Sequence, residues 1–240
     1  MPPGVVGGGP PTGVLVRAGA PRRQAHGTVN ADGFGVGWYA SDDPVPARYR
    51  RAGPIWGDLS FADLARVVRT GALMAAVRDA TEASADGEAG ASPFTSGTWL
   101  FSHNGALRDW PHSVADLAAA LPPAELLGLE ARCDSAFVWA LVLHRLRLGH
   151  APPEALAETV ERLADASPDS RLNLLLMDGE TIAATAWGDT LWYLADPDRG
   201  VVVASEPYDQ DPGWTEVPDR TLLTATRTDV LLTALKEASR

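Results

Sequence analysis

Residues 98–105 read TWLFSHNG, an apolar run typical of a buried β-strand that ends on His103, Asn104 and Gly105. An asparagine amide beside a glycine N–H is a suitable pair of donors for the oxygen of a tetrahedral acyl intermediate, because glycine lets the backbone come close to a reacting group. Asn-Gly is also among the commonest turn dipeptides, so the pair taken alone favours a hairpin turn. The stretch therefore predicts a strand followed by either a turn or an oxyanion hole.

The composition indicates a globular protein with a small-molecule partner. Of the 240 residues, 45% are hydrophobic, which is ample for a core. The 31 acidic and 20 basic residues give a net charge of −11, which repels nucleic acid and anionic membranes and favours a neutral or zwitterionic substrate. The single cysteine, Cys133, excludes an internal disulfide and leads us to expect a cytoplasmic protein. We find neither an apolar stretch of the roughly 18 residues that span a bilayer nor a signal-peptide pattern.

The first third of the chain predicts two strands and a helix. Residues 34–39, FGVGWY, predict a strand whose glycines let another chain segment approach closely. Ser60 and Asp63 resemble a capping box that opens a helix, which we expect to end at Gly71. Residues 72–77, ALMAAV, predict a buried strand.

The order of the remaining elements indicates an α+β fold. Residues 134–148 and 152–166 predict two helices, and five β-rich runs in the last third predict an antiparallel meander. Strands early, helices in the middle and strands late favour antiparallel sheets covered by helices. We expect one domain over residues 15–240, preceded by a Gly/Pro-rich arm at residues 1–14.

Two charged residues stand at the edges of expected elements. Arg78 follows the strand at 72–77, and Asp134 opens the first middle helix. The fork of an arginine suits a carboxylate, and a carboxylate suits an ammonium group, so together they could bind the head of an α-amino acid. Taken singly, Arg78 reads as a surface charge or ion-pair partner, Asp134 as a helix N-cap, and His103 as a hydrogen-bonded strand-end residue without metal-ligand spacing.

The order of the motifs favours the functional reading. NADGFGVGWY at 30–39, VRDAT at 77–81, HNG at 103–105 and CDS at 133–135 follow one another. This succession resembles the class II glutamine amidotransferase domains, which belong to the N-terminal-nucleophile hydrolases. It is most similar to the stand-alone branch of ergothioneine biosynthesis whose members cleave γ-glutamyl-hercynylcysteine S-oxide, and the resemblance covers roughly residues 15–235.

The resemblance implies a fold and a set of site residues. The fold is a four-layer α/β/β/α sandwich of two antiparallel sheets between helical layers. Asn104 and Gly105 would form the oxyanion hole, Arg78 would bind the substrate α-carboxylate and Asp134 its α-ammonium group. Thr81 and His103 would line or brace the pocket. Neither a metal nor an organic cofactor is implied, and water is the expected acyl acceptor.

The resemblance also implies a nucleophile that these residues do not supply. Family members begin, after removal of methionine, with a cysteine whose own amine acts as base, whereas this sequence begins Met-Pro-Pro. Cys133 belongs to the CDS motif, where a packing role at a helix start is expected. Either the start lies upstream of this sequence, or the chain is a γ-glutamyl-binding homologue without catalytic activity. Oligomeric state is left open.

Overall fold

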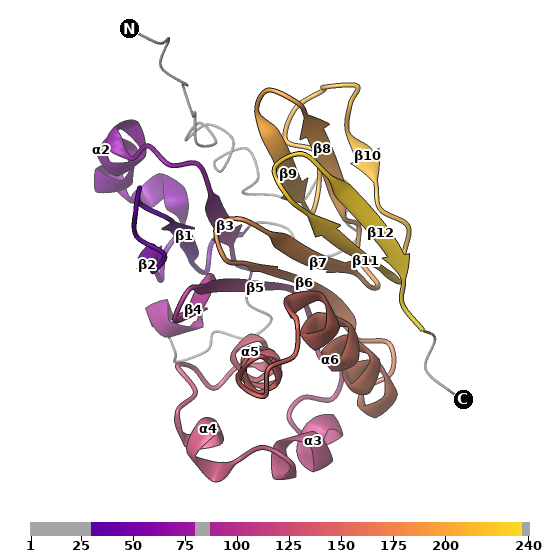
Figure 1. Cartoon of the computed structure of the whole chain (residues 1–240). Coiled ribbons are helices and arrows are strands. Elements are labelled where there is room, and N and C mark those ends of the chain that lie inside the picture. The colour runs from indigo at the N-terminus through magenta and orange to yellow at the C-terminus, as the bar shows by residue number, and fades with distance from the viewer. Residues whose placement is uncertain (1–29, 80–86, 237–240) are drawn as a thin grey trace, which may run out of the picture.

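The strand that begins at Trp99 is part of the largest sheet. The computed structural model describes residues 30–79 and 87–236. Six antiparallel strands follow the order β12-β11-β7-β6-β5-β4 (Figure 1). These strands are β4 (Phe94–Ser96), β5 (Trp99–Ala106), β6 (Arg171–Met177), β7 (Ile182–Ala186), β11 (Thr221–Ala225) and β12 (Val230–Ala234). β5 lies between β4 and β6, and its residues Leu100 and Phe101 are paired on both sides.

Helices cover one face of this sheet. α5 (Asp134–Arg147) and α6 (Pro152–Ala166) lie along it, as both predicted helices require, with the shorter α3 (Ala115–Ala119) and α4 (Pro123–Leu127) beyond them (Figure 1). Phe101 of β5 packs in one core cluster with Phe137 and Val142 of α5. In the described part of the chain, no helix is long and apolar enough to cross a membrane.

The other face carries a second layer of strands. One sheet, in the order β2-β1-β3, is made of β1 (Phe34–Trp38), β2 (Ala47–Arg51) and β3 (Leu73–Val77). The other, in the order β10-β8-β9, is made of β8 (Trp192–Asp196), β9 (Gly200–Ala204) and β10 (Thr215–Glu216). α2 (Leu59–Val67) covers the outer face of β1 through Phe61, which packs on Phe34.

The four layers therefore follow the expected order of helix, sheet, sheet and helix, and the fold class is confirmed. Within the described residues, the second layer consists of two separate sheets. The single meander expected for the last third is wrong, because β8 and β9 leave the large sheet and pack across it, while β11 and β12 return to its edge. The packing of apolar faces between the two layers decides which strands join which sheet. No local sequence pattern encodes this packing.

The start of α2 also differs from the sequence prediction. Asp58 is the N-cap, and its Oδ1 accepts hydrogen bonds from the backbone N–H groups of Ser60 (3.0 Å) and Phe61 (3.1 Å). Asp58 also accepts a hydrogen bond from the Tyr49 hydroxyl at 2.6 Å, and this bond lowers the pKa of the carboxyl. The contact to β2 selects Asp58 over the capping box expected at Ser60.

Two glycines set how closely the strand layers pack. Gly35 and Gly37 of β1 face the large sheet, where a Cβ at Gly37 would lie 2.6 Å from Leu100 Cδ2. A Cβ at Gly35 would overlap the carbonyl oxygen of Ser92. The close approach expected of residues 34–39 is confirmed, and the glycines are required because backbone and core atoms occupy the space that a side chain would need.

We predict that Gly35→Ala lowers the free energy of unfolding by about 1–3 kcal/mol or more, because the backbone at Ser92 must move. Chemical denaturation measures this difference. Gly53→Ala is the control, since nothing lies within 4 Å of the added methyl group; its stability should stay unchanged or rise. Equal stability of the two variants would contradict the packing described.

Candidate active site

The HNG motif lies within a strand. Asn104 and Gly105 belong to β5 and stand opposite Asn173 and Leu172 of β6. The hairpin-turn interpretation of Asn-Gly is therefore wrong, because β6, nearly seventy positions further along the chain, holds these residues in extended backbone.

Side-chain alternation places Asn104 between the two strand layers. Leu100 packs with Met74 of β3 and Tyr39, so this face of β5 looks toward the second layer, and Asn104 is four residues further on. Its Nδ2 is buried and makes no hydrogen bond to any described residue. A buried donor left unpaired costs about 1–3 kcal/mol. A buried N–H group without a protein partner can donate its hydrogen bond to a bound ligand, so Asn104 Nδ2 is a candidate ligand donor.

Gly105 is fixed by the neighbouring strand. Its φ is +155°, and a Cβ there would overlap the Arg171 carbonyl oxygen and lie 2.9 Å from His103 Nε2. No other residue fits this position without moving β6. The backbone beside Asn104 is thereby held in one conformation.

Asp134 ties the end of β5 to the start of α5. Its Oδ2 accepts a hydrogen bond from Leu107 N at 3.0 Å, and its Oδ1 accepts one from Ser135 N at 2.7 Å. The N-cap is Cys133, so the interpretation of Asp134 as the N-cap is wrong. Ser135 Oγ also lies 3.4 Å from Oδ1, whereas Oδ2 keeps a lone pair for a further donor. Asp134 thus binds the backbone of the residue that follows β5, two positions after Gly105.

His103 braces the same junction from the helical side. Its ring is buried between Ser135 Oγ, 3.1 Å from Nδ1, and the Arg171 carbonyl oxygen, 3.0 Å from Nε2. Because a carbonyl oxygen only accepts, Nε2 carries the proton. His103 and Asn104 point to opposite faces of β5. The geometry therefore supports bracing over lining of the pocket.

Arg78 lies in the second layer. Its backbone N–H donates to Gly33 O at 2.8 Å, so the pairing of β3 with the chain before β1 continues through it. Alternation puts its side chain on the same face as Met74, toward the large sheet. The guanidinium packs against Gly90 at the end of the 3-10 turn η2 (Gly87–Gly90), where a Cβ would lie 3.1 Å from Nη1.

The arrangement therefore places Asn104 and Arg78 on faces that look toward each other, with Asp134 at the end of β5. Thr81 lies outside the described residues. Among residues 30–79 and 87–236, no group of three or more His, Cys, Asp or Glu side chains could hold a metal ion. A buried amide donor, a cation and a carboxylate suit binding and polarisation of an amino-acid-like acyl compound.

Comparison with known proteins identifies the family of the chain. The sequence profile of the class II glutamine amidotransferases matches residues 12–197. The chain belongs to this family. The γ-glutamyl-hercynylcysteine sulfoxide hydrolase of Mycobacterium tuberculosis is 44% identical over 230 residues, which are 95% of this chain and 90% of that protein.

Solved structures agree on the fold. A class II glutamine aminotransferase domain protein from Silicibacter pomeroyi superposes with a TM-score of 0.69 at 27% identity, covering 86% of this chain and 92% of that one. The glutamine phosphoribosylpyrophosphate amidotransferase of Bacillus subtilis gives a TM-score of 0.65 at 16% identity, covering 94% of this chain and 46% of that one. At that identity the second likeness bears on the fold alone.

Sequence reasoning missed two polar residues beside the site. Asn173, opposite Asn104, accepts from Trp187 N at 2.8 Å and donates to the carbonyl oxygens of Asp189 and Thr190 at 3.0 Å each. Ser135 contacts His103. Asn173 sits in the apolar run LNLLLM, and a lone amide in such a run is the signal that could have found it.

The pair Asn104 and Asn173 yields a matched prediction. Asn104→Ala should change the free energy of unfolding by less than about 1 kcal/mol, because it removes an unpaired buried amide. Asn173→Ala should cost on the order of 2–4 kcal/mol, because three backbone groups lose their partner. Denaturant unfolding compares the two. A larger loss for Asn104→Ala than for Asn173→Ala would show that the Asn104 amide serves the fold.

Proposed function

We propose that this protein hydrolyses the γ-glutamyl amide bond of γ-glutamyl-hercynylcysteine sulfoxide, releasing glutamate and hercynylcysteine sulfoxide, in ergothioneine biosynthesis. The observation that carries the proposal is the buried, unpaired Nδ2 of Asn104 beside Gly105, on the face that looks toward Arg78. The name and 44% identity of the mycobacterial relative support the choice of substrate.

Recognition of the glutamyl group uses opposite charges. Arg78 offers a planar fork to the α-carboxylate, and Asp134 offers the remaining lone pair of Oδ2 to the α-ammonium group. Because Leu107 N and Ser135 N hold the Asp134 carboxylate, it needs little ordering when the ligand binds. The two charges distinguish a glutamyl group from a simple acyl chain.

The chemical step creates charge on the γ-carbonyl oxygen. A thiolate adds to the carbonyl carbon, and the Nδ2–H of Asn104 and the N–H of Gly105 donate to the oxyanion. The α-amine of the nucleophile's own residue, which took the thiol proton, passes it to the leaving nitrogen. The C–N bond then breaks, the amine departs and a thioester remains, which water hydrolyses to glutamate and free thiol.

The family resemblance assigns the thiolate to an N-terminal cysteine, and residues 1–29 of this sequence contain no cysteine, so the step needs a nucleophile that these residues do not supply. Cys133 is half-buried against the helical core, which supports a packing role for it.

The remaining parts of the proposal concern the setting of the reaction. A net charge of −11 supports a small-molecule partner over nucleic acid or an anionic membrane. The single cysteine supports a cytoplasmic location.

Glutamate release tests the proposal, measured on the protein expressed from the natural start of its gene. Release from γ-glutamyl-hercynylcysteine sulfoxide should exceed release from glutamine. Asn104→Ala should lower kcat about 100- to 1000-fold through loss of an oxyanion donor. Arg78→Ala and Asp134→Ala should act mainly on KM, which rises by about 10- to 100-fold as a charge-assisted contact is lost. Arg66→Gln, which removes an exposed arginine of α2, is the control.

Binding is measured separately by calorimetry with L-glutamate. Binding without turnover would contradict the hydrolase and favour a γ-glutamyl-binding protein. A protein that shows neither binding nor turnover would reject the pocket. So would variants Arg78→Ala and Asp134→Ala that bind glutamate as tightly as the wild type.

A further inference from the structure

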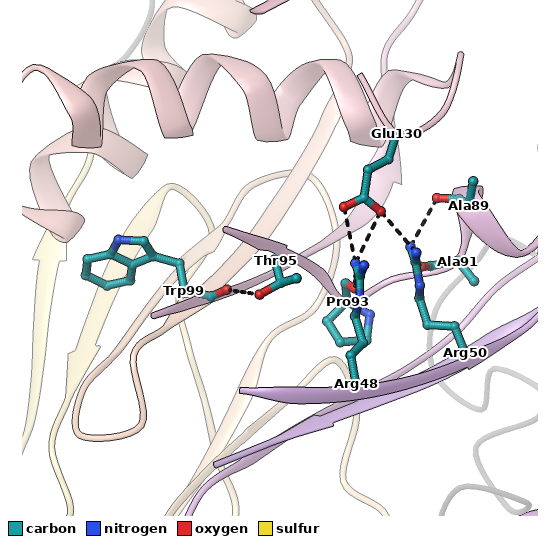
Figure 2. Close-up of polar contacts among 8 residues, drawn as sticks. All are labelled: Arg48, Arg50, Ala89, Ala91, Pro93, Thr95, Trp99 and Glu130. Atoms are coloured by element: carbon teal, nitrogen blue, oxygen red, sulfur yellow. Dashed lines mark hydrogen bonds and ion pairs between the residues drawn. The ribbon is translucent and has the colours of Figure 1, made fainter. Parts of the chain in front are cut away.

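Two arginines of β2 cross from the second layer to a single carboxylate (Figure 2). Arg48 and Arg50 stand opposite Gly37 and Gly35, so their side chains share the face of the glycines. Arg48 Nη1 and Arg50 Nη2 lie 3.2 and 3.0 Å from Glu130 Oε2. The absence of side chains at the two glycines leaves these arginines the room to pass: a Cβ at Gly35 would lie 2.8 Å from Arg50 Cγ.

Arg50 also binds the backbone on either side of Gly90. Its Nη1 donates to the carbonyl oxygens of Ala89 at 3.2 Å and Ala91 at 3.1 Å (Figure 2). The side chain is only 12% exposed, and its burial lowers the pKa of the guanidinium while Glu130 opposes that shift. The Arg50 guanidinium thus binds the carbonyl groups of the residues immediately before and after Gly90.

Gly90 lies directly beside the guanidinium group of Arg78. A Cβ there would lie 3.1 to 3.3 Å from the guanidinium atoms of Arg78, closer than most side-chain contacts allow. The turn therefore bounds the space of the Arg78 guanidinium on one side, and Arg50 binds the backbone on both sides of that contact.

We propose that Arg50, anchored by Glu130, is a positioning residue that seats Arg78 for the α-carboxylate of the γ-glutamyl substrate. This inference rests on the proposed function and adds to it a residue that does not itself touch the ligand. A purely stabilising ion pair would make Arg50 matter for unfolding alone, whereas a seat for Arg78 makes it matter for affinity in the folded protein.

A double-mutant cycle on the full chain tests the proposal. Calorimetry measures the affinity for L-glutamate of the wild type, Arg50→Gln, Arg78→Ala and the double variant. Arg50→Gln should weaken binding about 10-fold in the wild-type background and cause no further loss when Arg78 is already alanine, because residues that act through one another are non-additive. Arg66→Gln, an exposed arginine of an ion pair, should bind as the wild type does.

A second variant covers the case in which Arg50→Gln does not fold. Glu130→Gln keeps the bonds of Arg50 to residues 89 and 91 and changes a side chain that is 33% exposed, so the fold should survive. It should weaken glutamate binding about 3-fold, again only when Arg78 is present.

The outcomes separate the two proposals. Wild-type protein that fails to bind glutamate overturns the proposed pocket and the positioning role with it. Wild-type protein that binds, with Arg50→Gln and Glu130→Gln binding equally well, overturns the positioning role alone. Equal losses in both Arg78 backgrounds also overturn it, because Arg50 would then act by another route.

Discussion

The close approach of β1 to the large sheet is the constraint on which the rest of the structure depends. Gly35 and Gly37 let the backbone near Ser92 and the side chain of Leu100 come into contact with the second layer. This contact sets the separation of the layers, and with it the separation between Arg78 on one side and Asn104 on the other. A glutamyl group bound between them needs that separation fixed before it arrives, because ordering the pocket on binding would reduce affinity.

Local patterns predicted the elements well and their assembly less well. The periodicity of α5 and α6 and the alternation of the strands are properties of neighbouring residues, so the sequence displays them. The second sheet around β8 depends on contacts between distant segments. The strands β2, β4, β10 and β12 were missed. The same reason explains why Asn104 and Gly105 continue β5: pairing with β6 overrides the turn preference of the dipeptide.

The site shows a similar division. The order of motifs identified Arg78, Asn104 and Asp134, and the structure places them on facing layers and at one strand end. The order of motifs could not reveal the role of Arg50. The run ARYRR on an edge strand has the composition of a solvated surface, and Glu130 lies eighty positions away. Alternating glycines on β1 opposite alternating arginines on β2 are the signal, visible only when the register is known.

A crystal structure of the protein with L-glutamate bound would test the central claim most directly. The account predicts the γ-carboxylate oxygen within about 3.2 Å of Asn104 Nδ2, the α-carboxylate on Arg78 and the ammonium group on Asp134. Glutamate bound elsewhere, or an Asn104 amide engaged by a protein group while the ligand is present, would contradict it.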